Sequence, residues 1–324
     1  MPNLTVQAPA KLNLHLRIGA RQPGGLHNLE SFFVALAFGD TLNVQTIDQA
    51  GALEIHMRGC FPGEDSRNVE LAALPAEQNI IYRAVSLFRA KTGCNYGLRI
   101  TVDKRIPLGG GLGGGSTDAA AVLLAVNTLA APEDYPQNCP LSRDSLVELG
   151  AFLGSDVPFF LYEAVTAWVS GCGERIRPFR TPKPFHELAF LLVIPGFPSE
   201  TAAAYRLLDE SRAKNPVPPP PPPDNSPESL LQALSGPPEQ WPFENDFLPL
   251  FLADSPPDSS LKNAGTAFRR ILTTLRETGA AFAGLSGSGS TCFGVYPSHA
   301  AAKTAEIFLL KAGYTTNVTF PLAN

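Results

Sequence analysis

Six glycines fall within the seven positions Gly109–Gly115 ("GGGLGGG"), and two hydroxyl residues follow at once. Glycine loses more backbone entropy on folding than any other residue, so this density needs a reason, such as positive φ angles or close approach of the backbone to a ligand. Backbone N–H groups that converge on one point bind phosphate well, especially where a helix begins just after the loop. The stretch therefore predicts an anion site, with phosphate as the expected anion.

The segments on either side of the glycines predict how that site is built. Leu98–Ile106 alternates apolar and polar residues, which is typical of a strand, and Pro107 ends the pattern. Asp118–Leu129 is rich in Ala, Leu and Val and predicts a helix. Ser116 and Thr117 suit the N-cap and first turn of that helix. The expected order is therefore strand, glycine loop and helix N-terminus.

The surroundings of the loop also limit its other interpretations. A flexible turn is the simplest of them. The loop satisfies G-x-G-x-x-G, but a dinucleotide fold requires a parallel strand soon after the helix, and here a second helical pattern follows at Leu141–Leu153. A Walker A loop is excluded because it requires Lys followed by Ser or Thr, and no lysine occurs between Lys104 and Lys183.

Composition and charge limit the class of protein. The 324 residues suffice for two domains, and 44% apolar with 17% charged residues describe a soluble globular chain. A net charge of −5 without a dense Lys/Arg stripe predicts no nucleic-acid surface. Neither a signal peptide nor a membrane-spanning run is recognisable, and the five scattered cysteines suit free thiols in a reducing compartment. We therefore expect a cytoplasmic protein without nucleic-acid or membrane partners.

The remaining patterns predict interspersed strands and helices without regular βαβ alternation, which favours the α+β class. Residues 1–60 look β-rich; further strands are expected within 164–179, 188–195 and 280–296, and helices at 79–91, 199–214 and 299–312. A Pro-bearing stretch near residue 180 favours a boundary between domains 1–180 and 181–324. The run "NPVPPPPPPD" at 215–224 predicts a solvated polyproline insertion in the second domain, and the alternative is a ligand for an SH3-type domain.

Further motifs accompany the glycine loop along the chain. "APAKLNL" at 8–14 is followed by "RQPGGLHNLESFF" at 21–33, "LGSDVPFF" occupies 153–160, and "GLSGSGSTCFGVY" occupies 284–296. With "PLGGGLGGGSTDAAA" at 107–121, these motifs resemble the signatures of the GHMP small-molecule kinase superfamily, in the same order. Within the superfamily the resemblance is strongest to the kinases that phosphorylate 4-diphosphocytidyl-2-C-methyl-D-erythritol in the non-mevalonate isoprenoid pathway.

The resemblance implies a two-domain architecture in which an N-terminal domain like the second domain of ribosomal protein S5 meets a smaller α+β C-terminal domain. It also implies that the glycine loop wraps the phosphates of ATP, with Mg²⁺ expected beside them and no residue assigned as a metal ligand. The implied ATP-binding residues are Pro107, Gly109, Gly110, Gly111, Leu112, Gly113, Gly114, Gly115, Ser116, Thr117 and Asn79. Helix capping is the alternative role for Asn79 and for Ser116.

Two charged residues carry the chemistry that the resemblance implies. Phosphoryl transfer needs a placed hydroxyl, stabilisation of charge and often a carboxylate that accepts the hydroxyl proton. The family's catalytic Lys and Asp fall on Lys11 and Asp156. An ammonium group beside a carboxylate favours the ionised carboxylate and offsets developing negative charge. Taken alone, Lys11 would be a solvated surface lysine and Asp156 a cap for the turn before Pro158.

The implied substrate contacts are Asn13, Leu26, His27, Thr201 and Tyr205. Asn13 and His27 match positions that hold the acceptor and the cytosine ring, and Tyr205 matches an aromatic residue that packs on cytosine. Without the resemblance, His27 would be a structural loop histidine and Tyr205 a buried face of an amphipathic helix. Leu26 departs from the family, which has at this position a tyrosine that stacks on the base.

The expected function is ATP-dependent phosphorylation of the 2-hydroxyl of 4-diphosphocytidyl-2-C-methyl-D-erythritol by a monomer or homodimer. One alternative is a related GHMP kinase with a different acceptor alcohol. Another is a non-catalytic relative that binds a sugar or nucleotide, although the presence of both Lys11 and Asp156 argues against it. A dinucleotide-dependent oxidoreductase is the most distant possibility.

Overall fold

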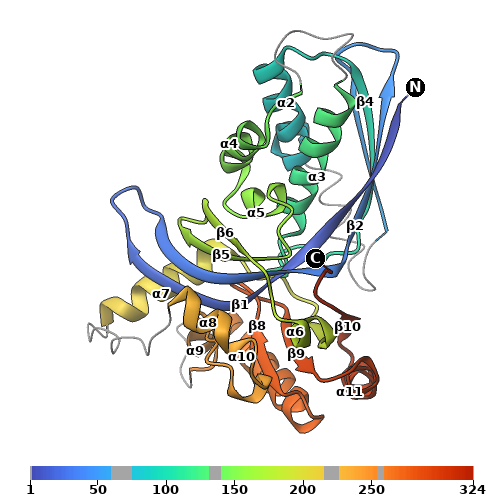
Figure 1. Ribbon diagram of the computed structural model, residues 1–324. Helices are drawn as coiled ribbons and strands as arrows, with labels where there is room; N and C mark the ends of the chain where they lie inside the picture. The colour runs from blue at the N-terminus through green and yellow to red at the C-terminus, as the bar shows by residue number, and fades with distance from the viewer. Residues whose placement is uncertain (1, 60–74, 131–139, 215–225, 254–258, 324) are drawn as a thin grey trace.

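Two β-sheets lie back to back at the centre of the protein, and helices cover the outer face of each sheet (Figure 1). The computed structural model describes residues 2–59, 75–130, 140–214, 226–253 and 259–323. The apolar core has three parts: one between the first sheet and its helices, one between the sheets, and one between the second sheet and its helices. The mixture of sheets and helices confirms the expected α+β class.

The first sheet is built around a long antiparallel hairpin formed by β1 (Asn3–Arg21) and β2 (His27–Ile47). On the other edge of β2, different halves of this strand pair with β4 (Gly97–Asp103) and β5 (Thr166–Gly171). The outer strands are β3 (Leu53–Arg58), parallel to β4, and β6 (Arg175–Phe179), antiparallel to β5.

Helices α2 (Ile80–Thr92), α3 (Gly114–Leu129), α4 (Arg143–Leu153) and α5 (Val157–Leu161) cover the outer face of this sheet. A 3-10 turn at Ala76–Gln78 precedes α2. The central helix is α3, and its small alanine side chains are buried against β1, β2 and α2. The N-terminus of α3 is thereby held close to the middle of β1, where Lys11 lies.

The second sheet is antiparallel, with the order β10-β7-β9-β8. Its strands are β7 (Ala189–Ile194), β8 (Phe282–Leu285), β9 (Cys292–Tyr296) and β10 (Thr315–Thr319). The helices α7 (Thr201–Lys214), α9 (Leu248–Phe251), α10 (Ser259–Glu277) and α11 (His299–Lys311) pack on its outer face. Two short helices, α6 (Lys183–Glu187) and α8 (Pro227–Ala233), add Phe185 and Leu230 to the core between the sheets, and a 3-10 turn spans Pro238–Gln240.

Two long helices differ from the expectation, and the short helices α5, α6, α8 and α9 and the strand β10 are not among the expected elements. Helix α3 begins at Gly114 rather than at Asp118, because Gly113 takes the N-cap position with a φ of 73° and the last two glycines enter the helix. Helix α10 has no counterpart among the expected elements, although Phe268, Ile271 and Leu275 are buried at helical spacing.

The predicted domain boundary near residue 180 falls between the last strand of the first sheet and the first strand of the second. It remains a proposal, since the chain end returns to the first sheet, where the Leu322 N–H donates to the Ala35 carbonyl at 2.9 Å. The proline run at 215–224 lies outside the described residues. Among the helices that the structure describes, none has the length and apolar character needed to span a bilayer.

Candidate active site

The glycine loop forms the wall of a cavity of about 430 Å³. Gly109, Gly111 and Gly113 have φ values of 65°, 74° and 73°, so every second residue takes a left-handed conformation that only glycine adopts easily. Such alternation turns successive N–H groups toward a common point, which is the geometry of an anion-binding nest. The first residues of α3 line the same cavity with N–H groups that have no partner within the helix.

A second loop, Ser286–Thr291, packs directly on the glycine loop. The carbonyl of Gly109 accepts from the N–H of Ser290 at 3.3 Å, and the carbonyl of Gly110 accepts from the N–H of Thr291 at 3.1 Å. A Cβ atom on Gly111 would lie only 2.2 Å from the carbonyl oxygen of Ser286. The glycines therefore also allow two backbones to touch, a role additional to the expected approach of a ligand.

Lys11 and Asp156 meet in the same cavity, with Lys11 Nζ at 3.3 Å from Asp156 Oδ2. Lys11 is 4% exposed, so the interpretation of it as a solvated surface lysine is wrong. Pairing of β1 with β2 shifts register on both sides of the Lys11–Asn13 segment, and such bulges re-aim side chains. Asp156 precedes α5 but makes no capping hydrogen bond, so its carboxylate faces the cavity instead.

Asn13 lies in the motif at 8–14 and connects it with the motifs at 21–33, 107–121 and 284–296. Its side-chain oxygen accepts from Lys11 Nζ at 2.6 Å, and its amide nitrogen donates to Ser31 Oγ at 2.9 Å. Its backbone N–H donates to Ser286 Oγ at 3.3 Å, and that hydroxyl donates to the carbonyl of Gly111 at 2.9 Å. No role is assigned to Ser286 from the sequence, although it lies within a motif on which the resemblance rests.

A neutral histidine, His15, stabilises the position of Ser31, which binds Asn13. His15 is fully buried, and burial, with a smaller effect of the Arg17 charge, lowers its pKa to about 4. Its Nδ1 accepts from the N–H of Glu244 at 3.2 Å, and its carbonyl accepts from Ser31 Oγ. His15 thus remains neutral at physiological pH and helps to fix Ser31, the partner of Asn13.

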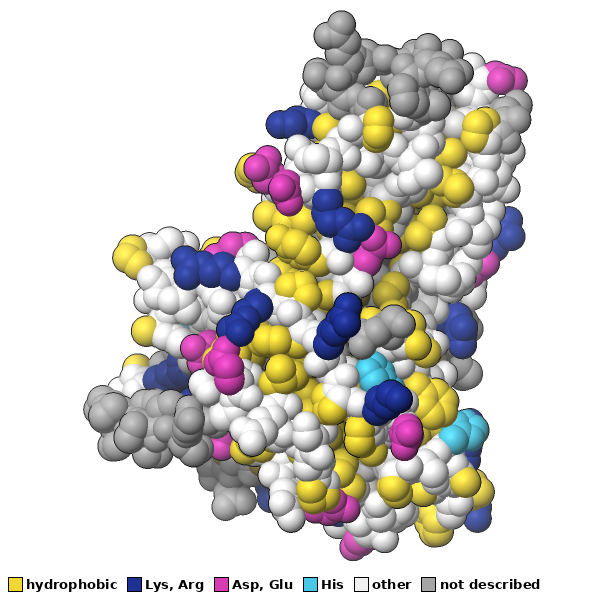
Figure 2. Space-filling view, in the orientation of Figure 1, with side chains coloured by type: hydrophobic (Ala, Val, Ile, Leu, Met, Phe, Trp, Pro, Cys, Tyr) yellow, Lys and Arg dark blue, Asp and Glu magenta, His cyan; other side chains and the backbone are white. Residues whose placement is uncertain are grey.

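A larger cavity of about 940 Å³ adjoins the first, because Leu29, Ser155, Thr201 and Tyr205 line both. The tip of the β1–β2 hairpin forms one wall. In the space-filling view the outline is indented on the left, between this tip and the part that contains α4 (Figure 2). Leu26 lies at the cavity, 63% exposed.

His27, in contrast, is buried and its Nε2 lies 2.7 Å from Asp209 Oδ1. Because an ionised carboxylate only accepts hydrogen bonds, Nε2 carries the proton in this contact and Nδ1 remains for another partner. The ring of His27 lies 5.0 Å from the ring of Tyr205, with 30° between their planes.

Helix α7 carries five of the described residues that line this second cavity. Thr201, Tyr205 and Asp209 follow at four-residue intervals, so they share one face of the helix. Thr201 Oγ1 lies 3.0 Å from Ser288 Oγ, on the side of the glycine loop. Burial, and then the nearby charge of Asp156, raises the pKa of Tyr205 to about 12, so the phenol stays neutral. Asp209 is missed by the sequence analysis, but its helical spacing from Tyr205 could have indicated it.

Of the expected nucleotide contacts, Ser116 lines the cavity, whereas Asn79 and Thr117 do not. Asn79 caps α2, and its side-chain oxygen accepts from the N–H of Ile81 at 2.9 Å, while the next residue, Ile80, lines the cavity. Ser116 lines the cavity, and the alternative of Ser116 as N-cap is wrong because Gly113 holds that position. Thr117 is buried inside the first turn of α3 and does not line the cavity.

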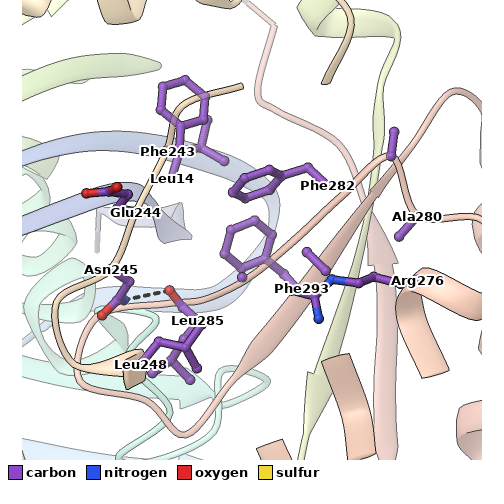
Figure 3. A pocket seen from close by; sticks show the side chains of 13 residues that line it. Leu14, Phe243, Glu244, Asn245, Leu248, Arg276, Ala280, Phe282, Leu285 and Phe293 are labelled. Carbon is purple, nitrogen blue, oxygen red and sulfur yellow. Dashed lines mark hydrogen bonds between the residues drawn. The ribbon is translucent and has the colours of Figure 1, made fainter. Parts of the chain in front are cut away.

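A third cavity, of about 420 Å³, adjoins the base of the Ser286–Thr291 loop (Figure 3). Asn245 lies at its wall and donates its amide to the carbonyl oxygens of Leu285 at 2.8 Å and Gly287 at 2.9 Å. Figure 3 shows the first of these hydrogen bonds as a dashed line. Asn245 therefore holds the start of the loop that packs on the glycines, a support that no sequence motif indicates.

The described residues around the cavity of the glycine loop offer few ligands for a metal ion. Within the described ranges, no group of three or more His, Cys, Asp and Glu side chains is close enough to hold a metal ion. Asp156 is the acidic side chain that lines the cavity of the glycine loop. The described residues that line this cavity thus offer one carboxylate and several hydroxyl groups as oxygen ligands.

The fold and the site define an ATP-dependent small-molecule kinase of the GHMP superfamily. Family models for the GHMP kinases N terminal domain and the GHMP kinases C terminal match residues 79–164 and 253–314. A 4-diphosphocytidyl-2-C-methyl-D-erythritol kinase from Xanthomonas axonopodis pv. citri is 34% identical over 92% of this chain and 84% of its own. The chain belongs to the 4-diphosphocytidyl-2-C-methyl-D-erythritol kinase family.

Two further comparisons agree with this membership. A relative of the same name from Treponema pallidum subsp. pallidum is 36% identical over 96% of both chains. The crystal structure of a 4-(cytidine 5'-diphospho)-2C-methyl-D-erythritol kinase superposes with a TM-score of 0.72 at 29% identity, covering 98% of this chain and 99% of the other. The similarity thus extends over both sheets and their helices.

Proposed function

We propose that this kinase transfers the γ-phosphoryl group of ATP to the 2-hydroxyl of 4-diphosphocytidyl-2-C-methyl-D-erythritol, a step in isoprenoid precursor synthesis. The names of the relatives support the substrate. The pair of buried Lys11 and partly exposed Asp156 carries the proposal, because it lies where a phosphate-binding cavity meets a second, larger one.

The nucleotide occupies the smaller cavity in this proposal. The N–H groups of Gly109–Gly115 and the start of α3 bind the phosphates, where the partial positive charge of the helix favours anions. Pro107, Leu112 and Ser116 line the same cavity, and Ile80 offers an apolar contact beside Asn79 for the adenine. Mg²⁺ accompanies ATP and offsets part of its charge.

Asp156 and Lys11 act on the acceptor hydroxyl. The Asp156 carboxylate accepts the hydroxyl proton as the oxygen attacks the γ-phosphorus. The Lys11 ammonium, held by Asn13 at 2.6 Å, orients the acceptor oxygen and offsets negative charge on the transferred group. Since Lys11 is buried, water screens this charge less than it would at the surface.

The larger cavity takes the cytidine diphosphate part of the acceptor. His27 Nδ1 contacts the base edge, and the ring of Tyr205 packs on the base. Leu26 supplies an aliphatic contact in place of the tyrosine usual in the family. Thr201 lines both cavities, and its hydroxyl group binds the diphosphate or the alcohol of the acceptor in this proposal.

We further infer that the enzyme works in the cytoplasm as a monomer or homodimer, with small molecules as partners and without a nucleic acid. The net charge of −5 and the scattered cysteines support this inference.

An ADP-release assay across four acceptors tests the proposed function. The cytidine diphosphate alcohol should support turnover, whereas mevalonate, homoserine and galactose should not, because each lacks the base that the larger cavity takes. Turnover with one of these three and none with the cytidine substrate would reassign the acceptor. ATP binding without turnover of any acceptor would favour a non-catalytic relative.

Replacing Asp209 tests the base end of the site. Asp209→Ala should raise KM for the cytidine substrate about tenfold, because a hydrogen bond to a charged group contributes roughly 1.5–3 kcal/mol. KM for ATP and kcat should change less than twofold, since Asp209 lies away from the glycine loop. Glu210→Ala is the matched control, because Glu210 is the next residue of α7 and is exposed. Equal KM values for both variants would remove Asp209 from base recognition.

A further inference from the structure

A cluster of three buried charges lies at the base of the glycine loop. Lys104, directly after β4, donates to Asp118 Oδ2 at 2.7 Å and also to Asp40 Oδ2. The side chains of Asp40, Lys104 and Asp118 are 0%, 3% and 3% exposed. None of them lines the cavity, so the proposed chemistry does not use them directly.

The cluster holds both ends of the loop. Asp40 Oδ1 accepts from the backbone N–H groups of Arg105, at 2.5 Å, and Ile106, at 2.8 Å, the two residues that precede Pro107. Asp118 is the fifth residue of α3, which begins where the loop ends. A Cβ atom on Gly114 would lie 2.9 Å from Ile106 and 3.5 Å from Lys104 Nζ. The charges are therefore one backbone layer away from the cavity.

The charges of this cluster do not balance. One ammonium and two carboxylates carry a net charge of −1 in a site that is almost completely buried, and Asp118 Oδ1 has no hydrogen-bond partner among the described residues. Burial raises the pKa of Asp118 to about 7. The charge of Lys104 lowers this pKa, and the charge of Asp40 raises it. Burial also opposes the charge of Lys104, but the two carboxylates outweigh it and raise the Lys104 pKa.

Other charged side chains on the elements that pack on α3 have partners outside this cluster. Lys11 of β1 contacts Asn13 and Asp156. Arg83 and Arg89 of α2 and Arg143 of α4 donate to backbone carbonyls outside the cluster. The charged groups that face Asp118 within the described chain are thus Lys104 and Asp40.

We propose that Asp118 is a positioning residue of the glycine loop and that it takes up a proton when nucleotide binds. This inference rests on the proposed function. The phosphates bring negative charge to the other side of Gly114, and a nearby like charge favours the neutral carboxylic acid. The neutral acid leaves one ammonium paired with one carboxylate, so the cluster balances while both loop ends stay held. The proton comes from solvent.

Calorimetry of nucleotide binding measures this proton directly. Mg²⁺-ATP is titrated into the enzyme without acceptor, at pH 7, in three buffers with different ionisation enthalpies. The slope of the binding enthalpy against ionisation enthalpy gives the protons taken up. A group with a pKa near 7 is half protonated at this pH, so we expect uptake of about half a proton.

Asp118→Asn removes the titrating group but keeps its shape, and the uptake should disappear. Asp144→Asn is the matched control, because Asp144 lies in the first turn of α4 and is exposed, and it should keep the wild-type uptake. Protons contributed by ATP itself cancel in this comparison. Binding with equal uptake by wild type and Asp118→Asn overturns the inference alone, whereas absence of ATP binding to the wild type overturns the proposed function and this inference with it.

An infrared difference spectrum of the wild-type enzyme gives a second measurement if Asp118→Asn does not fold. Nucleotide should add the absorption of a protonated carboxyl group. Nucleotide binding without that absorption overturns the proposal.

Discussion

Asp156→Asn is expected to lower turnover about 10²–10⁴-fold, the range over which general acid–base groups act. The amide keeps the shape of the side chain but cannot accept the hydroxyl proton. ATP affinity should change little, because the glycine loop and the start of α3 line the nucleotide cavity independently of this carboxylate. Single-turnover rates by rapid quench, with ATP dissociation constants by calorimetry, separate the two quantities.

The control for this change is Asp103→Asn, which alters an exposed carboxylate at the end of β4. Lys11→Met should also lower the rate, and the double variant should lose less than the product of the single losses, since paired catalytic groups act as a unit. A near-normal single-turnover rate for Asp156→Asn would show that Asp156 is only a turn residue.

Gly111→Ala is expected to weaken ATP binding at least about 100-fold and to lower Tm. The added Cβ would lie 2.2 Å from the carbonyl oxygen of Ser286 and 2.8 Å from that of Gly289, and neither backbone can move without the other loop. The φ of 74° adds strain for any residue with a Cβ, of order 1–3 kcal/mol. Both effects displace the N–H groups that we propose bind the phosphates.

Gly115→Ala separates the loop packing from a general effect of lost glycine. Its Cβ would lie 3.7 Å from Ile80, an ordinary contact, and alanine suits the first turn of a helix better than glycine. Its Tm should therefore match or exceed that of the wild type. Differential scanning calorimetry and ATP titration give the two readouts. Wild-type ATP affinity in Gly111→Ala would mean that the contact with Ser286–Thr291 does not shape the nucleotide site.

Local patterns predict the fold class, most strands and most of the long helices, because alternation and capping act within a few residues. The short helices α5, α6, α8 and α9 are not predicted. The start of α3 was misplaced since the φ of Gly113, which sets it, depends on packing of the loop. The sequence of α10 has amphipathic spacing, although this helix is not among the predicted elements.

Some residues of the candidate site could likewise be predicted from the sequence, and others could not. The structure brings Lys11, Asn13 and Asp156 together in the cavity of the glycine loop, at positions that the resemblance indicated. Their functional roles stay predictions. Asp40 could not be found from local spacing, since its partner Lys104 lies 64 residues away in the chain. The helical spacing from Tyr205 indicates Asp209 itself, but not its contact with His27, which lies 182 residues away. Such contacts depend on the tertiary fold and leave no periodic pattern.

Helix α7 has a consequence for the size of acceptor that the enzyme takes. Thr201, which lines both cavities, and Asp209, which holds His27, are eight residues apart, and eight residues of α-helix rise about 12 Å. A rigid helix keeps this separation constant, so with the proposed substrate contacts we expect the enzyme to select acceptors by length as well as by base. A cytidine monophosphate alcohol, shorter by one phosphate, can reach His27 or the transferred phosphoryl group but not both. Cytidine analogues of graded linker length should therefore show a maximum of kcat/KM at the diphosphate.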